Sequence, residues 1–329
     1  MGLATTLRGR YKAPMRALSR LLLPTRLAAL AALAALPTVA CEDPAAAPDA
    51  ADDASDAADS ADAADVAAPP PANPLFDPAG EIALVEQVSE GTPVQAEVSA
   101  RLYSAPQPNL QRFVAEVGDC QLWVRPPALC DPPCNAFTEA CVPGPACVAL
   151  PEGRSAGAIT ITGTTPSLAL TYAGQGQYFA NADPPADVFA KGASLAITAA
   201  GGELAAFTAT LTGVGDLADT FGAVALVDGA STTVNWTPAG DGSRIELVLQ
   251  LGWHANPPEA VIFCQAPDSA GAIVIASEIV KDFPYFEGMG LFQVPSWVQR
   301  VSRATVASAA GPIAIYAASR QAVSVTHSP

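Results

Sequence analysis

The stretch VQAEVSARL at residues 94–102 is the clearest indication of the fold. From Val94 to Leu102 every second residue is apolar, and Gln, Glu, Ser and Arg lie between them. In an extended strand, alternate side chains point to opposite faces. One face of this strand is therefore expected to pack on a core while the other meets solvent.

The same period of two recurs along the chain. Alternating runs lie at residues 159–162, 168–172, 207–212 and 245–253, and segments containing Gly or Pro separate them at 163–166, 201–202, 213–215 and 240–242. Short alternating strands joined by such turns are typical of antiparallel sandwiches and barrels. We therefore expect an all-β body at residues 75–329, an antiparallel β-sandwich of one domain or of two packed sub-domains.

Two segments depart from this pattern. Residues 277–283 are expected to form a short helix that is capped by Ser277 and stops before Pro284. Residues 304–319 carry no charge, and Gly311-Pro312 in their middle suits a hairpin turn better than a membrane span. No other segment reaches transmembrane length.

The composition is acidic and rich in residues that resist helix. The chain has 32 Asp and Glu against 16 Lys and Arg, a formal charge of -16, with 31 Pro and 25 Gly. A large helical bundle is disfavoured by this composition. Nucleic-acid binding needs Lys and Arg clustered on one face, and the chain after position 41 has no such cluster. We expect no nucleic-acid partner.

The first 40 residues have the organisation of an export signal. Six basic residues lie between Arg8 and Arg26, and an uncharged run made mostly of Leu and Ala follows at 27–40. This run is shorter than the roughly 20 residues that a bilayer span needs. We expect a signal peptide at 1–40, with Met1 or Met15 as its start.

The residues Thr38-Val39-Ala40-Cys41 resemble a bacterial lipobox, in which the cysteine receives diacylglycerol. We expect lipidation at Cys41, and ordinary signal cleavage is the alternative. Acyl chains contribute about 0.8 kcal/mol of membrane binding per buried methylene. The membrane is then a partner through the lipid anchor. The protein would belong to the cell envelope, in the inner or the outer membrane, with its body in the periplasm or at the cell surface.

A low-complexity segment follows the cysteine. Residues 41–74 consist mainly of Ala, Asp, Pro and Ser, with nine acidic residues and no basic one. Like charges repel along any helix that this segment forms, and the triplet Pro69 to Pro71 ends it. A disordered tether is expected here. Calcium binding by the Asp repeat is disfavoured because the glycine turn of an EF-hand loop is missing.

Six cysteines follow Cys41, an even set that suits an oxidising compartment. They are Cys120, Cys130, Cys134, Cys141, Cys147 and Cys264. Six cysteines allow 15 pairings. We expect an interlaced, EGF-like pair in a Cys-rich insertion at 120–147, Cys130 with Cys141 and Cys134 with Cys147, and a third bond between Cys120 and Cys264. Zinc is the competing interpretation, but CxxC is absent.

Several motifs resemble those of a group of uncharacterised predicted lipoproteins from high-GC Gram-negative bacteria. They are Val117-Gly118-Asp119-Cys120, the four-cysteine cluster, the stretch SAGAITITG at 155–163, Val234-Asn235-Trp236-Thr237-Pro238 and Ile262-Phe263-Cys264. The resemblance covers most of the body, and its motifs are structural. It implies an envelope location and a β fold, and it implies no activity.

Catalytic motifs are not found in the sequence. His254 and His327 are the two histidines, and the G-x-S-x-G, H-E-x-x-H, P-loop and G-x-G-x-x-G patterns are missing. A strand-end or loop position explains His254 better than a catalytic base. A carboxylate pair for hydrolysis would leave no short motif, so that alternative stays open. We expect no cofactor and no resident metal.

Aromatic residues are the better candidates for a site. Trp236, Trp253 and His254 are our candidate ligand-binding residues, and Trp123, Trp297, Tyr285 and Phe286 are further aromatics that could join an exposed patch. Core packing is the alternative for each. Four turn aspartates, Asp216, Asp219, Asp228 and Asp241, are weaker candidates for calcium.

The sequence thus indicates a non-catalytic binding or structural module that meets a protein or carbohydrate at the cell surface. The alternatives are a secreted carboxylate-dependent hydrolase and a carbohydrate-binding module. An enzyme predicts a concave pocket in which carboxylates of shifted pKa converge, whereas a binding module predicts an aromatic or polar patch.

Overall fold

The computed structural model describes residues 71, 73, 75, 78–127, 130–252, 258–284 and 295–329. The chain divides into two units, Met1–Asp65 and Val66–Pro329, and all described residues belong to the second. The predicted signal peptide, Cys41, Trp253 and His254 lie outside the described residues, as does the predicted tether apart from Pro71 and Asn73.

The described body consists almost wholly of β-strands, which confirms the predicted all-β class. Its helical elements are α1 (Ser277–Asp282) and the single 3-10 turn η1 (Asp268–Ala270). Among the residues that the structure describes, no helix has both the length and the apolar character needed to cross a membrane.

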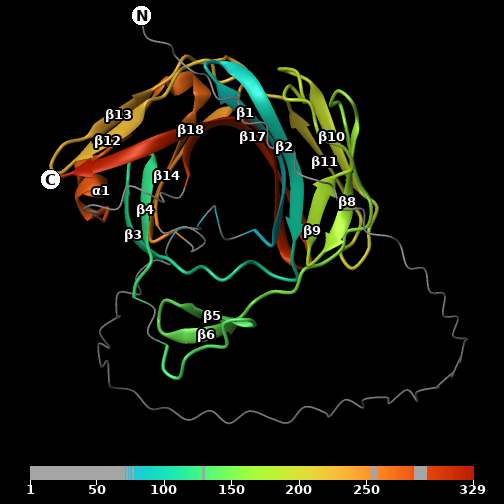
Figure 1. Cartoon of the computed structure of the whole chain (residues 1–329), viewed down its shortest axis with the longest axis horizontal. Helices are drawn as coiled ribbons and strands as arrows, with labels where there is room; N and C mark the ends of the chain where they lie inside the picture. Colours follow the sequence, from blue (N-terminus) through green and yellow to red (C-terminus); the bar gives the residue numbers. More distant parts are fainter. Residues whose placement is uncertain are drawn as a thin grey trace, which may run out of the picture. The chain divides into compact units, whose positions relative to one another are not determined.

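One large mixed sheet dominates the body (Figure 1). Its central strands are, in spatial order, β2 (Thr92–Leu102), β1 (Gly80–Ser89), β18 (Gly311–Ser328), β17 (Ser296–Ser308), β14 (Arg244–Leu251), β15 (Ala260–Pro267), β4 (Cys120–Val124) and β3 (Arg112–Val117). Neighbours in this series are antiparallel, except that β1 and β18 are parallel. The β17–β18 hairpin confirms the turn expected within 304–319, and its turn lies at Ala309 and Ala310, just before Gly311.

Further strands extend this sheet and complete the body. Beyond β2 follow β9 (Gln177–Ala180), β8 (Leu168–Gly174), β7 (Ile159–Thr162), β10 (Ser194–Ala199) and β11 (Phe207–Thr212). At the other end, β12 (Ala223–Val227) pairs in parallel with the last residues of β18. Two small antiparallel pairs remain, β13 (Thr232–Asn235) with β16 (Ala272–Ile275) and β5 (Glu139–Val142) with β6 (Ala146–Ala149).

Two hydrophobic cores pack on the same face of the central strands. In the first core, Ile82 and Ile315 of β1 and β18 pack with residues of β7 and β10 such as Ile161. In the second, Leu247 of β14 packs with residues of β13, β16 and α1 such as Ile279. Figure 1 shows β18 extending from β1 and β2 toward β12 and α1, so this strand serves both cores. We call the opposite side of the central strands the inner face.

The period of two in the sequence predicted those strands that have one solvent-exposed face. The runs at 94–102, 159–162, 168–172 and 207–212 fall in β2, β7, β8 and β11. The run at 245–253 falls in β14, but both faces of that strand are buried from Ile245 to Leu251, so its expected solvent-exposed side is wrong. The predicted helix is α1, although its N-cap is Ala276 and Ser277 makes no capping hydrogen bond.

The three disulfides confirm the expected pairing. Cys130 bonds to Cys141 and Cys134 to Cys147, which ties the β5–β6 hairpin to the loop before it. Cys120 bonds to Cys264 between neighbouring strands β4 and β15. The cysteines that the zinc interpretation would have needed are therefore consumed in disulfides.

Candidate functional site

The inner face carries a cavity of about 470 Å³. Its walls come from β1, β2, β14, β17 and β18, from the segment that follows β2, and from the β5–β6 region. The lining residues are Leu75, Pro78, Gly80, Glu81, Arg101, Tyr103, Gln107, Pro108, Leu110, Ala140, Leu150, Glu246, Val248, Trp297, Gln299, Arg303, Ala314, Tyr316 and Arg320. Small-molecule sites span about 300–1,000 Å³, so the volume suits such a ligand.

A ladder of polar side chains crosses three strands at the base of the cavity. Glu246 of β14, Gln299 of β17 and Arg320 of β18 occupy one row, because Glu246 pairs with Gln299 and Gln299 with Arg320 in the strand register. Gln299 Nε2 donates to Glu246 Oε2 at 2.7 Å, and Arg320 Nε donates to Gln299 Oε1 at 2.8 Å. Each side chain thereby fixes the orientation of the next.

Arg303, four residues beyond Gln299 on β17, completes the ladder. Its Nε and Nη2 donate to the two Glu246 oxygens at 2.6 and 2.7 Å, a bidentate ion pair. Burial acts to lower the pKa of Arg303, but the hydrogen bonds and the charge of Glu246 outweigh this effect and raise that pKa. Glu246 is only 2% exposed, so its charge is compensated within the protein.

Two aromatic rings lie beside the guanidinium groups. Arg303 lies 4.7 Å from the centroid of the Tyr316 ring, and Arg320 lies 4.7 Å from that of Trp297, both within cation–π range. Burial, with a contribution from Glu81, raises the pKa of Tyr316 to about 12. The Tyr316 hydroxyl therefore stays protonated at neutral pH and can donate a hydrogen bond.

The rest of the cavity is largely apolar. Val248 belongs to a small cluster on the inner face, against which Leu75 and Trp297 pack. Leu110 and Leu150 line other parts of the cavity. Leu150 immediately follows the disulfide-tied hairpin, and its backbone N–H donates to Thr138 O at 2.8 Å. The Cys-rich insertion thus contributes part of the cavity wall.

Trp297 also carries an unsatisfied donor. Its indole Nε1 is shielded from solvent and has no hydrogen-bond partner among the described residues. A buried N–H without an acceptor is unfavourable and rare in folded proteins.

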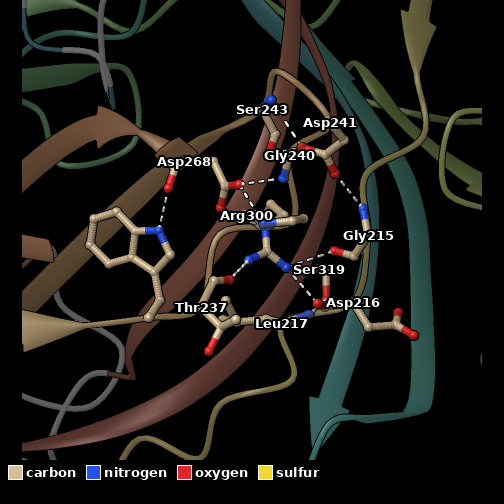
Figure 2. Close-up of polar contacts among 12 residues, drawn as sticks. Gly215, Asp216, Leu217, Thr237, Gly240, Asp241, Ser243, Asp268, Arg300 and Ser319 are labelled. Carbon is tan, nitrogen blue, oxygen red and sulfur yellow. Dashed lines mark hydrogen bonds and ion pairs between the residues drawn. The ribbon is translucent and has the colours of Figure 1, made fainter. Parts of the chain in front are cut away.

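A second polar cluster, shown in Figure 2, is centred on Arg300 of β17. It includes Gly215 and Asp216, which lie between Val214 of the first core and Leu217 of the second. Arg300, 1% exposed, donates from Nε to Asp268 Oδ1 at 3.0 Å, from Nη2 to Thr237 O at 2.7 Å, and from Nη1 to Gly215 O and Asp216 O. Asp268 also accepts from the backbone of the loop at 239–240. We call this group the Arg300 cluster.

The Arg300 cluster holds structure together. All three nitrogens of its guanidinium have acceptors, and both carboxylate oxygens of Asp268 have donors. Nearby, burial raises the pKa of Asp216, with a further contribution from Asp187. On the same face, burial raises the pKa of Glu86 to about 7, although Glu86 Oε1 accepts from the backbone N–H groups of Val188 and Phe189 at 2.6 and 3.0 Å.

The structure corrects the choice of Trp236. It is 5% exposed, packs in the second core, and donates from Nε1 to Asp268 O at 2.7 Å, so it is a core residue and offers no exposed surface. Trp123 is likewise buried, at 3% exposed. Trp253 and His254 lie outside the described residues, so those two hypotheses stay predictions.

The turn aspartates do not gather into a calcium site. Asp219 accepts from Thr237, Asp241 accepts from Gly215 and Ser243, and Asp228 contacts His327. Within the described ranges, the only group of potential metal ligands is Cys130, Cys134 and Cys141, and these are disulfide-bonded.

Sequence reasoning missed Arg303, Arg320 and Tyr316. A signal was present, because Trp297, Gln299 and Arg303 fall on one side of β17 by the period of two. This periodicity predicts a polar and aromatic face on the first half of β17, before the uncharged hairpin turn.

No protein-family model matches the chain, and a search of curated proteins found no significant match. The site is therefore interpreted from its own geometry.

Proposed function

We propose that this chain is a lipid-anchored cell-envelope protein whose β body binds a small molecule in the inner-face cavity and does not transform it. The observation that carries the binding proposal is the cavity, in which oriented Arg and Gln side chains and two aromatics border an apolar wall. A largely apolar concavity with a few oriented polar groups is the usual form of a ligand site.

The arrangement of carboxylates favours binding over hydrolysis. A carboxylate-dependent hydrolase needs two such groups with different protonation states facing the substrate. Glu81 and Glu246 are the carboxylates that line the cavity, and both oxygens of Glu246 are engaged by Arg303 and Gln299. The carboxyl groups with raised pKa, Glu86 and Asp216, do not line the cavity.

The cavity suits a sugar less well than it suits a ligand that binds to the guanidinium groups of Arg303 and Arg320. Carbohydrates stack on open aromatic faces. One face of Trp297 is covered by Arg320, and one face of Tyr316 by Arg303. This geometry supports binding through the arginines.

A retention experiment tests binding in the cavity. The full chain and its Ala314→Trp variant are purified from the envelope of a Gram-negative host, and released small molecules are identified by mass spectrometry. Ala314 lines the cavity, so a Trp side chain there should occupy it. Val94→Trp is the matched control, because Val94 is 59% exposed on β2 and does not line the cavity.

We expect at least one compound to be retained by the wild type and by Val94→Trp and lost from Ala314→Trp. Identical profiles for all three proteins would contradict the proposal. Melting curves of the three proteins, recorded by circular dichroism, separate loss of the ligand from loss of the fold. Ala314→Leu offers a smaller obstruction if the Trp variant does not fold.

Support for the envelope location comes from the lipobox-like residues Thr38 to Cys41 and from the acidic segment that follows. Intact mass spectrometry of the membrane fraction tests it. We expect a diacyl or triacyl adduct that disappears in Cys41→Ser, and a gain of about six hydrogens on reduction, which corresponds to three disulfides. An unmodified soluble product would contradict lipid anchoring.

A further inference from the structure

We propose that the cavity binds an organic carboxylate with an apolar body, and that Arg320 receives the carboxylate group. This inference rests on the proposed binding function and specifies the chemical class of the ligand. It is drawn from the charges, the hydrogen-bond donors and the apolar wall of the cavity.

The cavity lining carries three arginines and two glutamates, Glu81 and Glu246, which is one positive charge in excess. Ten of the 16 Lys and Arg residues follow position 41, and three of these ten, Arg101, Arg303 and Arg320, line the cavity. Arg303 is paired with Glu246. Neither Arg101 nor Arg320 forms an ion pair with a carboxylate of the described residues, and Arg320 is half-buried whereas Arg101 is exposed. A half-buried guanidinium without a counterion favours an anionic ligand.

Arg320 is also held in a fixed orientation. Gln299 accepts its Nε–H at 2.8 Å, and Gln299 is itself held by Glu246. Stacking on Trp297 restrains the guanidinium from a second direction. A guanidinium has five N–H donors, and Gln299 accepts one of them. Because the group is preorganised, a ligand loses less affinity to the ordering of the side chain.

The neighbouring groups are donors as well. The Tyr316 hydroxyl is protonated at neutral pH, and Arg320 lies close enough to it to act on its pKa. Arg320 and Tyr316 together offer donors to a group that only accepts, and a carboxylate is such a group.

The remaining wall indicates the body of the ligand. Leu75, Leu110, Leu150 and Val248 contribute apolar side chains to the cavity lining. A volume of about 470 Å³ exceeds what a small inorganic anion would fill. A hydrocarbon attached to the carboxylate would cover these apolar side chains and exclude water from the ion pair.

Isothermal titration calorimetry of the full chain tests the inference with octanoate, 1-octanol and octyl phosphate as probes. The variants are Arg320→Gln and Arg320→Lys. Arg154→Gln is the control, because Arg154 forms an exposed ion pair with Glu152 and does not line the cavity. We expect octanoate to bind best, with its affinity at least tenfold lower in Arg320→Gln, partly lower in Arg320→Lys and unchanged in Arg154→Gln.

Three results would overturn the inference. Tighter binding of octyl phosphate than of octanoate would replace the carboxylate by a phosphate. Equal binding of octanoate and octanol, with no effect of Arg320→Gln, would leave a binding cavity without anion recognition. Failure of all three probes would remove this ligand class, whereas the binding function itself is judged by the retention experiment. Melting curves identify any variant that does not fold. If Arg320→Gln does not fold, the octanoate affinity of Arg320→Lys decides whether Arg320 receives the carboxylate.

Discussion

Arg300 shows how a single buried charge can connect two cores. Arg300 belongs to β17, its partner Asp268 belongs to η1, and its other acceptors lie in the loops at 215–216 and 237. A buried ion pair contributes little net stability, but removing one partner leaves an uncompensated charge. The Arg300 cluster therefore fixes which loops lie at the boundary of the two cores.

Replacing Arg300 by Ala should lower the free energy of unfolding by about 3–5 kcal/mol, because Asp268 would stay buried without its counterion. Urea unfolding measures this change. Arg154→Ala is the control and should change stability by less than about 1 kcal/mol, because its ion pairs are exposed. Equal effects of the two substitutions would show that burial of the Arg300 pair has no energetic consequence.

The raised pKa of Glu86 predicts that the stability of the fold depends on pH. Its pKa is about 7 in the folded protein and near 4.5 when unperturbed. Between these values the unfolded chain loses the proton that the folded chain keeps, so stability falls as pH rises from about 4.5 to about 7. Both backbone donors bind Oε1, so a neutral side chain can keep these bonds.

Glu86→Gln should remove this dependence. In urea unfolding at pH 4.5 and pH 8, the variant should gain stability relative to the wild type at pH 8 and match it more closely at pH 4.5. Exposed Glu97 on the neighbouring strand gives the control Glu97→Gln, for which we expect no such difference. If Glu86→Gln changed the free energy of unfolding by the same amount at both pH values, burial of Glu86 would not be the cause of the pH dependence.

At the scale of elements, the pattern of exposure decided which strands could be predicted. Strand β7 alternates between buried and exposed residues and was found at its bounds. Strand β1 was missed because both of its faces are buried, with Ile82 in the first core and Ala83 in an inner-face cluster. Periodicity disappears where a sheet is covered on both sides. The cysteine spacing left 15 pairings open, and the EGF-like pattern chosen among them is the one that the structure shows.

The disulfides should differ in their effects. Replacing both Cys120 and Cys264 by Ala should lower the free energy of unfolding by about 2–5 kcal/mol, because this bond closes a loop of 144 residues within the second core. Replacing both Cys130 and Cys141 should destabilise the body less but weaken octanoate binding, because it loosens the hairpin beside Leu150. Urea unfolding and calorimetry measure the two effects. Equal octanoate affinity in both double variants would show that the β5–β6 hairpin does not form part of the cavity wall.

At the scale of the whole molecule, the cavity could not be predicted from the sequence. Glu81 and Arg320 are far apart along the chain and line the same cavity only because β1 pairs in parallel with β18. Trp297 was noticed as one of four tryptophans, and its alternation with Gln299 and Arg303 indicates a shared strand face without showing whether that face lines a cavity or packs in a core, as Trp236 does. The distinction depends on which face of the sheet each side chain occupies, and tertiary pairing sets that.

The shared sheet also predicts joint unfolding of the two cores. Because β17 and β18 contribute to both, neither core is complete without them. In a variant whose other three tryptophans are replaced by Phe, urea unfolding followed by the fluorescence of Trp236 in the second core should coincide with unfolding followed by circular dichroism of the whole sheet. Two separate transitions would show that the cores are independent domains.

A crystal structure of the full chain grown with octanoate would test the cavity proposal most directly. We predict density for the carboxylate within about 3 Å of the Arg320 guanidinium, with the hydrocarbon along Val248 and Leu110. A cavity that holds only water, or octanoate bound elsewhere on the body, would contradict the proposal.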